Sequence, residues 1–369
     1  MPLNVGIVGL PNVGKSTIFS ALTSVPAEAA NYPFCTIDPN VGIVPVPDER
    51  LQKLSEIIPT EKVIPTVVEF VDIAGLVRGA SKGEGRGNQF LAHIRETGII
   101  AHVVRCFDDD DVTHVDGSID PIRDIETIDI ELALADLETV TRRRERLEKE
   151  LKSHDKKIAA TAKAVQPVLE MLTAHLQEGR PARSLEMTPE QRALIYDLHL
   201  LTVKPVLYVC NVDESGVDGG SPYETLVRDH ATREGAEVVR ICGQLEAEIA
   251  ALETVEERQA FLDDAGLQEP GLAQLIRSGY RGLGMRTFFT AGPKENRAWT
   301  FREGATAPEA AGVIHTDFQK GFIRAETYHI EDLFTYGSEQ KVREAGKLRQ
   351  EGKEYRVKDG DVMFFKFNT

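Results

Sequence analysis

The sequence predicts an α/β protein with a doubly wound parallel sheet, an inserted helical hairpin and a small C-terminal α+β block. Short apolar runs, each followed by a loop rich in Gly, Asp or Asn, occur at 4–8, 67–73, 99–107 and 205–210. Helical stretches separate these runs, which is the pattern of buried parallel strands joined by helices. A long amphipathic stretch and a change in charge along the chain indicate the other two parts.

Charge is distributed unevenly along the 369 residues, whose formal net charge is −16. Residues 1–129 and 201–279 each carry a net charge of −9, whereas residues 130–200 are neutral and residues 280–369 carry +2. Two acidic blocks around a neutral segment predict one domain interrupted by an insert and followed by a second domain. We therefore expect a nucleotide-binding domain at 1–130 and 204–279, a helical insert at 131–203 and a C-terminal domain at 280–369.

Membrane and disulfide-rich classes are excluded by composition. No run approaches the roughly 18–20 apolar residues of a membrane span, and the N-terminal residues lack the basic flank of a signal peptide. The four cysteines are far apart and form no CxxC pair, which argues against a zinc site or a disulfide framework. A cytoplasmic protein without membrane contact is expected.

The insert has a heptad-like pattern. Positions from Leu137 to Ile158 recur at spacings of three and four and are mostly apolar, although Arg144 and His154 interrupt the pattern. Pro167 should end or kink this long helix. A second helix should run from the Thr188-Pro189 start to about Val203. Together they predict an antiparallel hairpin of two helices.

The C-terminal block predicts a small mixed domain. Short strands are expected at 287–290, 298–301, 321–325, 355–357 and 362–365, and one helix at 309–320. The Asp359-Gly360 pair predicts that the last two strands form a hairpin.

Residues 9–16 match the phosphate-binding loop G-x-x-x-x-G-K-[ST] in full, between a predicted strand and a predicted helix. Glycines allow successive backbone N–H groups to converge on phosphate oxygens at a helix N-terminus. Lys15 should reach the β- and γ-phosphates, and Ser16 should bind Mg²⁺. The nucleotide-binding residues predicted here are Asn12, Val13, Gly14, Lys15, Ser16 and Thr17.

A D-x-x-G sequence follows the second buried strand, about 60 residues after the phosphate-binding loop. Asp72 should hold Mg²⁺ through water, and the Gly75 amide should contact the γ-phosphate. Thr36 lies where a threonine completes the Mg²⁺ coordination in nucleotide switches. The four glycines of residues 79–87 suit either a loop that becomes ordered with triphosphate or an ordinary flexible loop.

Base recognition is expected at residues 211–214, after the fourth apolar run. Guanine-specific switches carry N-K-x-D there, but this chain has Val212 in place of Lys and Glu214 in place of Asp. Because adenine presents an acceptor where guanine presents a ring N–H, a carboxylate clamp would reject adenine. The altered motif, beginning at Asn211, argues against strict guanine specificity without proving adenine.

Leu76 occupies the position of the water-orienting glutamine that follows D-x-x-G in Ras-type switches. A leucine side chain cannot bind water, so hydrolysis must be slow or use another group. Asn12 is one candidate, through a K⁺ ion beside the phosphates. His114 is another, as a histidine that orients or deprotonates water, and its alternative is a solvated surface residue.

These motifs together resemble the Obg-like ATPases, in particular the YchF branch of the P-loop translation-factor class. The resemblance rests on residues 9–16, 33–40, 72–78, 83–88, 211–214 and 243–246, and it covers essentially the whole chain. It implies that the C-terminal block is a TGS-like β-grasp domain, that ATP is preferred over GTP, and that hydrolysis is slow and Mg²⁺-dependent.

The same resemblance assigns further roles. It implies that His114 is catalytic, that the Val212 backbone contacts adenine, and that Gly243, Gln244 and Leu245 line the base pocket. Gln244 stands where relatives often have alanine. The implied partner is the ribosome, through its large subunit and rRNA, and the chain is expected to be a monomer.

Two other functions fit the same residues: a GTP-specific ribosome-assembly GTPase, and a regulatory module in which ATP occupancy matters and hydrolysis is incidental. Contact with rRNA is hypothesised for residues 142–157, which hold eight basic and four acidic side chains. A solvated, salt-bridged helix face is the alternative for that segment.

Overall fold

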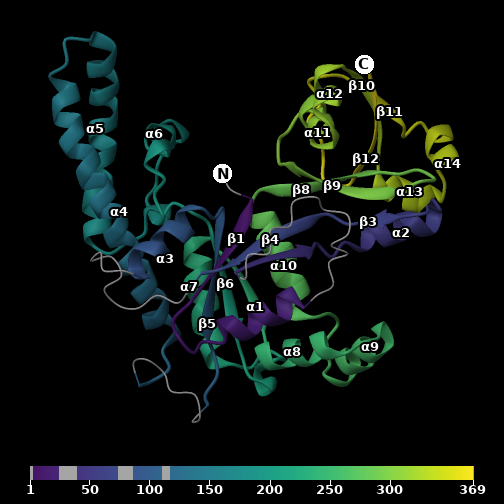
Figure 1. Ribbon diagram of the computed structural model, residues 1–369, viewed down its shortest axis with the longest axis horizontal. Coiled ribbons are helices and arrows are strands. Elements are labelled where there is room, and N and C mark those ends of the chain that lie inside the picture. Colours follow the sequence, from purple (N-terminus) through teal and green to yellow (C-terminus); the bar gives the residue numbers. More distant parts are fainter. Residues whose placement is uncertain (1–2, 25–39, 74–85, 110–116, 369) are drawn as a thin grey trace. The chain divides into compact units, whose positions relative to one another are not determined.

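The computed structural model describes residues 3–24, 40–73, 86–109 and 117–368 (Figure 1). Contacts divide the chain into two compact units, Met1–Gly42 with Glu69–Gly279 and Ile43–Val68 with Tyr280–Thr369. The helical insert belongs to the first unit. The division into three domains at 130, 203 and 279 stays a prediction.

A six-stranded sheet in the order β2-β4-β1-β5-β6-β7 forms the centre of the first unit. Its strands are β1 (Asn4–Val8), β2 (Val41–Pro45), β4 (Val67–Asp72), β5 (Ile99–Arg105), β6 (Val206–Asn211) and β7 (Glu237–Ile241). β1 pairs in parallel with β4 and β5, and β6 pairs in parallel with β5 and β7. Every residue of β5 and β6 is buried, including His102, Arg105 and Asn211, which explains why the other residues of these strands are apolar. The predicted doubly wound sheet is confirmed.

Helices cover this sheet in two groups. α1 (Lys15–Thr23) packs against α8 (Gly243–Ala251), and α4 (Pro121–Leu151) packs against α7 (Pro222–Glu234). The strand order reverses at β1, with β4 on one side and β5 on the other. Parallel sheets of this kind bind ligands in the crevice at the carboxyl ends of the strands beside such a reversal. The remaining helices of this unit include α3 (Arg86–Arg95), α9 (Val255–Asp264) and α10 (Gly271–Gly282).

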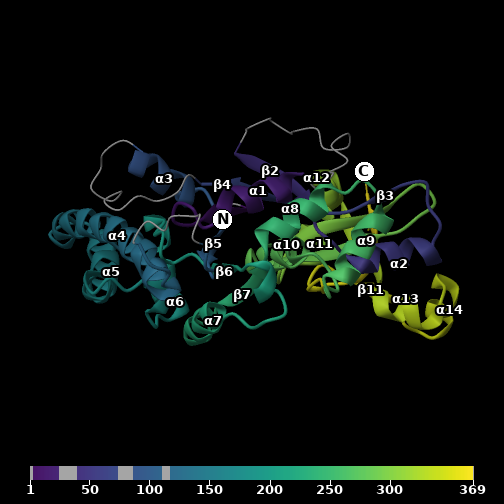
Figure 2. The same ribbon diagram turned by 90° about the horizontal axis from the view of Figure 1, so that it is seen from below.

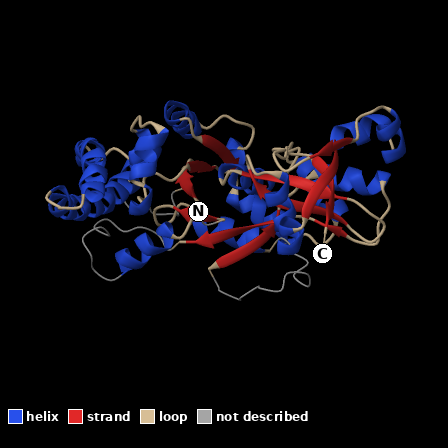
Figure 3. Ribbon diagram, turned by 90° about the horizontal axis from the view of Figure 1, so that it is seen from above, coloured by secondary structure: helices blue, strands red, loops and turns tan. Residues whose placement is uncertain are grey.

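The insert is a hairpin of α4 and α5 (Lys156–Gln177), which lie side by side in Figures 1 and 2. Figure 3, coloured by secondary structure, shows this pair as helices joined by a loop. Its seam is a buried apolar cluster that includes Val140, Leu147, Ala162, Val165, Leu169, Leu172 and Leu176. The hairpin therefore has a core of its own.

Two details of the predicted insert are wrong. The first helix ends at Leu151 rather than near Pro167, because Asp155 caps a new helix by accepting hydrogen bonds from the N–H groups of Lys157 and Ile158. Pro167 lies inside α5. The helix expected at 188–203 is short, α6 (Pro189–Leu194) followed by a 3₁₀ turn, η4 (Tyr196–Leu198), so the hairpin partner of α4 is α5. The predicted start at Thr188-Pro189 is confirmed, and a capping box of Thr188 and Gln191 forms there.

The second unit contains a mixed sheet in the order β11-β10-β12-β8-β9-β3. Its elements are α2 (Glu49–Ile57), β3 (Val63–Ile64), β8 (Met285–Thr290), β9 (Asn296–Arg302), α11 (Ala307–Ile314), α12 (Thr316–Lys320), β10 (Phe322–His329), α13 (Ile330–Tyr336), α14 (Glu339–Glu344), β11 (Arg349–Glu351) and β12 (Asp361–Phe367). β8 pairs antiparallel with β9, and β12 pairs antiparallel with β10 and parallel with β8. The predicted α+β character is confirmed.

The predicted C-terminal hairpin is wrong. Residues 355–357 form no strand, and the partners of β12 are β10 and β8. The Asp359-Gly360 turn docks on β8 instead: Thr287 N–H donates to the Asp359 carboxylate at 2.8 Å, and Gly360 N–H donates to the Thr287 carbonyl at 2.8 Å. The helix expected at 309–320 is two helices, because His315 adopts an extended conformation and caps α12.

Among the described residues, no helix combines the length and the apolar character needed to cross a membrane.

Candidate nucleotide-binding site

The loop between β1 and α1 has the backbone shape that its glycines permit. Gly14 adopts φ 89° at the start of α1, and Asn12 also has a positive φ of 62°. A Cβ on Gly14 would lie 2.1 Å from Nδ2 of Asn211. No side chain fits in that space, so the glycine is required both by its conformation and by close packing.

Asn211, the last residue of β6, ties two nucleotide-binding segments together. Its side-chain amide donates to the Val13 carbonyl at 2.9 Å, and its Oδ1 accepts from Gly243 N–H at 3.0 Å. The residue is 5% exposed. One buried amide therefore joins the phosphate-binding loop to the N-terminus of α8.

Lys15 and Asp72 meet at the carboxyl ends of β1 and β4. The Lys15 ammonium forms a short ion pair with the Asp72 carboxylate, and Lys15 is 9% exposed. The structure thus brings together the lysine of the phosphate-binding loop and the aspartate of D-x-x-G, although 57 positions separate them. A cation and a carboxylate at one point suit a Mg²⁺-bound triphosphate.

A cavity of about 680 Å³ opens beside this loop. Ligand sites for small molecules span roughly 300–1,000 Å³. Four segments line it, at the ends of β1, β5 and β6 and along α8: Asn12, Gly14, Thr17, Phe107, Asp108, Asp109, Asn211, Val212, Asp213, Cys242, Gly243, Gln244, Ala247, Glu248 and Ala251. The cavity lies where the strand order predicts a ligand.

Most predicted contacts of the nucleotide have a described position. Asn12, Gly14, Thr17, Asn211, Val212, Gly243 and Gln244 line the cavity. Val13, Lys15, Ser16 and Leu245 belong to the same segments without lining it, and Glu214 is exposed in a 3₁₀ turn beyond it. Thr36, Gly75, Leu76 and His114 lie outside the described residues.

Sequence reasoning missed the segment after β5. Phe107, Asp108 and Asp109 line the cavity, and the fully buried Arg105 holds their backbone. The Arg105 guanidinium donates to the carbonyls of Phe107 and Asp109 at 3.2 and 3.0 Å, and it lies 4.6 Å from the centre of the Phe107 ring. The signal was available: the end of β5 lies beside the reversal in strand order, where this fold binds ligands.

The residues present fit a Mg²⁺ ion that arrives with a nucleotide. Ser16 offers a hydroxyl and Asp72 a carboxylate, both hard oxygen donors of the type Mg²⁺ prefers. In the part of the chain that is described, no group of three or more His, Cys, Asp or Glu side chains could hold a metal by itself. Mg²⁺ commonly binds through one or two protein oxygens plus substrate phosphates, and this donor set suits that mode.

Glu246 is a buried carboxylate on α8, the helix whose Gln244 and Ala247 line the cavity. It is 3% exposed, and its Oε1 accepts from Gly271 N–H at 2.6 Å. Burial raises the pKa of Glu246 to about 7, although the N–H groups of Gly271 and Leu272 act in the opposite direction. The folded protein therefore holds a proton that the unfolded chain releases near pH 4.5.

We expect Glu246→Gln to remove a pH dependence of stability. In the wild type, the free energy of unfolding should fall as pH rises from about 4.5 to about 7, by about 3 kcal/mol in total. Glutamine keeps an acceptor for Gly271 N–H and cannot ionise, so the variant should be more stable than wild type at pH 8 and similar at pH 4.5. Urea unfolding at both pH values measures this. Parallel pH profiles for the two proteins would contradict it.

Comparisons with known proteins agree with this geometry. Residues 4–168 match a family described as "50S ribosome-binding GTPase", and residues 285–368 match the YchF-GTPase C-terminal family, described as "Protein of unknown function (DUF933)". The chain is 56% identical to "Ribosome-binding ATPase YchF" of Bacillus subtilis (strain 168) and 55% identical to that of Escherichia coli O157:H7, over 100% of each chain.

A solved structure shares the fold. It is the "Structure of the Schizosaccharomyces pombe YchF GTPase", with a TM-score of 0.88 and 38% identity, over 99% of this chain and 97% of that chain. Identity above half of the residues over the full length, with the same fold, identifies the chain as a member of the YchF family.

Proposed function

We propose that this protein is a Mg²⁺-dependent P-loop ATPase that prefers ATP over GTP, hydrolyses it slowly and associates with the large ribosomal subunit. One observation carries the proposal. Asn211 joins the phosphate-binding loop to α8, and both segments line a cavity that Glu214, at the position of the guanine-binding aspartate, does not line.

The preference for ATP is supported by two carboxylates. Glu214, at the position of the guanine-binding aspartate, is exposed and does not line the cavity. Asp213 does line it, but its Oδ1 already accepts from Gly216 N–H and from Ser215 Oγ, each at 2.8 Å. A guanine base in the cavity would meet no carboxylate from Glu214, and one of the two oxygens of Asp213 is already occupied. A buried ring N–H or amino group left unpaired costs about 1–3 kcal/mol. The Bacillus subtilis relative is called an ATPase and the Schizosaccharomyces pombe relative a GTPase, so the choice of base is argued from the residues.

Hydrolysis in this proposal relies on charge rather than on a glutamine. Lys15 would stabilise the β- and γ-phosphates, and Mg²⁺ held by Ser16, Thr36 and water on Asp72 would neutralise developing negative charge. The Gly75 amide would contact the γ-phosphate. Leu76 leaves the attacking water without a partner at that position, so His114 is the proposed group that orients it, with K⁺ near Asn12 as a further source of positive charge.

Association with ribosomes is supported by the relatives from Bacillus subtilis and Escherichia coli, which are named ribosome-binding ATPases. The protein would act as a cytoplasmic monomer that regulates translation or a stress response. Basic residues of the insert are the proposed contact with rRNA.

Calorimetric titration with ATP and GTP analogues, with and without K⁺, tests the choice of base. We expect the ATP analogue to bind at least about tenfold tighter, since one unpaired buried polar group is worth about 1.4 kcal/mol or more. Tighter binding of the GTP analogue would favour the ribosome-assembly GTPase instead.

Sedimentation with purified large ribosomal subunits tests the proposed partner. Failure of the protein to sediment with these subunits at low salt would refute the proposed association.

A further inference from the structure

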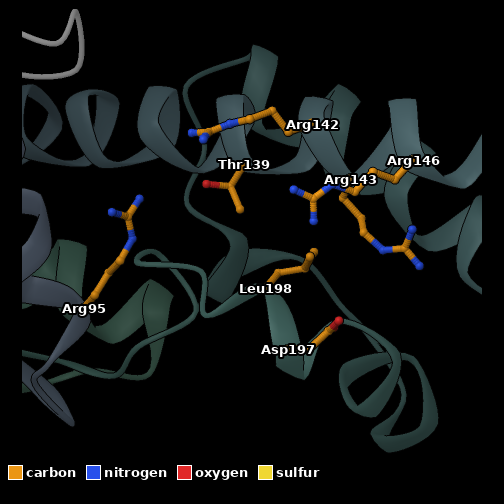
Figure 4. Close-up of a pocket in the computed structure, with 7 residues that line it drawn as sticks. All are labelled: Arg95, Thr139, Arg142, Arg143, Arg146, Asp197 and Leu198. Atoms are coloured by element: carbon orange, nitrogen blue, oxygen red, sulfur yellow. The ribbon is translucent and has the colours of Figure 1, made fainter.

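A second cavity, of about 330 Å³, lies on the helical insert and is lined mainly by arginines. Its lining residues are Arg95, Thr139, Arg142, Arg143, Arg146, Asp197 and Leu198. Figure 4 shows Arg95 on one side, the arginines of α4 along another, and Asp197 and Leu198 across from that helix. All belong to the first unit, and none lines the nucleotide cavity. This arginine cavity is a separate site.

Two of its four arginines already have a carboxylate partner. Arg143 forms a bidentate pair with Glu150, at 3.1 and 2.9 Å. Arg142 pairs with Glu138 at 3.1 Å, but both side chains are about 60% exposed. Exposed pairs of this kind are worth only about 0.2–1 kcal/mol, so Arg142 can exchange Glu138 for a stronger anion at little cost.

The guanidinium groups of the other two, Arg95 and Arg146, make no ion pair with any residue that the structure describes. Arg95 ends α3, and Arg146 lies in the second half of α4. Among the residues that the structure describes, Asp197 is the only carboxylate that lines the cavity. Three guanidinium groups are therefore available to a single anion, and guanidinium is the side chain best matched to phosphate geometry.

The polar groups beside the arginines favour RNA over other phosphates. Asp197 offers carboxylate oxygens, and the Thr139 hydroxyl, which donates to the Ala135 carbonyl at 3.1 Å, keeps its oxygen lone pairs as acceptors. A ribose 2′-hydroxyl is a donor that such acceptors bind, and DNA lacks it. A carboxylate would instead repel a second phosphate or an acidic peptide.

We propose that the arginine cavity binds one backbone phosphate of RNA, with Arg95, Arg142 and Arg146 on the phosphate and Asp197 on the adjacent 2′-hydroxyl. This deepens the proposed association with ribosomes and rests on it for the identity of the RNA. It also replaces a diffuse basic helix face by a defined contact formed by the second half of α4, the end of α3 and residues 197–198.

The test compares two pairs of substitutions with the same change in charge. Arg95→Gln with Arg146→Gln removes two cations from the cavity, whereas Lys156→Gln with Lys157→Gln removes two exposed cations from the far end of the same hairpin. Binding of a fluorescein-labelled RNA hairpin, and of a DNA hairpin of the same sequence, is measured by anisotropy between about 50 and 200 mM KCl. Sedimentation with large ribosomal subunits is measured in parallel.

We expect the cavity pair to weaken RNA binding at least about tenfold and to lower the salt slope by about 0.7–0.9, the value for one phosphate contact, and the lysine pair to weaken binding less than about threefold. Asp197→Asn should reduce the preference for RNA over DNA. Both double variants should bind ATP with the affinity of wild type and unfold at the same urea concentration, because the four substituted side chains are exposed and lie outside the nucleotide cavity.

Three results would overturn the proposal. An equal loss of RNA affinity in both double variants would indicate a diffuse basic surface. Equal affinity of the wild type for the RNA and DNA hairpins would exclude recognition of RNA. Full competition by an oligoglutamate peptide would indicate that the cavity binds an acidic protein. If the cavity pair loses RNA binding while wild type fails to sediment with ribosomal subunits, the arginine cavity stands and the proposed ribosomal partner falls.

Discussion

Lys15→Ala is expected to lower the rate of ATP hydrolysis by at least about 100-fold, which is the typical cost of removing one preorganised charge from a transition state. Lys15 is almost fully buried at the end of the phosphate-binding loop, where its ammonium already faces the Asp72 carboxylate. Among the described residues, no lysine or arginine lines the adjacent cavity, so Lys15 is the cation that the phosphate-binding loop itself supplies. Phosphate release with saturating Mg²⁺-ATP measures the effect.

Lys53→Ala is the matched control, because Lys53 is an exposed helical lysine paired with Glu49 in the second unit. It should hydrolyse ATP like wild type. A Lys15→Ala variant that hydrolyses ATP at the wild-type rate would contradict the role of Lys15. If Lys15→Ala still binds ATP and supports full biological activity without turnover, nucleotide occupancy carries the function, as in the regulatory module considered above.

Asn211→Ala is expected to destabilise the protein by about 2–4 kcal/mol and to weaken ATP binding at least about tenfold. The substitution leaves the buried Val13 carbonyl and Gly243 N–H without their partner, at about 1–3 kcal/mol each. It also frees the phosphate-binding loop from α8, so that binding must reorder both segments. Urea unfolding and calorimetric titration with an ATP analogue measure the two effects.

Asn296→Ala provides the matched control for Asn211. Asn296 is fully buried in the second unit, where its amide donates to the Ile58 carbonyl at 2.8 Å and its Oδ1 accepts from Gly292 N–H at 3.1 Å. Its loss should lower stability by a similar amount and leave the affinity for ATP unchanged. Equal loss of affinity in both variants would show that general destabilisation, rather than the tie through Asn211, is responsible.

The phosphate-binding loop could be predicted residue by residue because its chemistry is local. Gly14, Lys15 and Ser16 are adjacent in sequence, and a strand before them and a helix after them are enough to orient their backbone. The acidic and neutral charge blocks likewise anticipated an insert, and the apolar runs anticipated the buried strands β1, β4, β5 and β6.

The role of Asp155 shows where sequence patterns fail. A heptad-like pattern continues through residues 152–155, and Pro167 looks like a breaker, yet the chain turns at Asp155 and continues through Pro167. The turn allows α5 to bury its apolar side against α4. Packing of one helix on the other outweighs the local preference of a single proline.

By itself, the sequence determined that the chain binds a nucleotide and that its base motif departs from the guanine-specific form, because these properties belong to contiguous residues. Only the tertiary structure decided that Asn211 joins two distant segments, that Arg105 holds the Phe107–Asp109 backbone, and that Arg95 meets the arginines of α4 in one cavity. Each of these contacts joins residues that the folded backbone brings together. Local propensity and spacing carry no information about such distances.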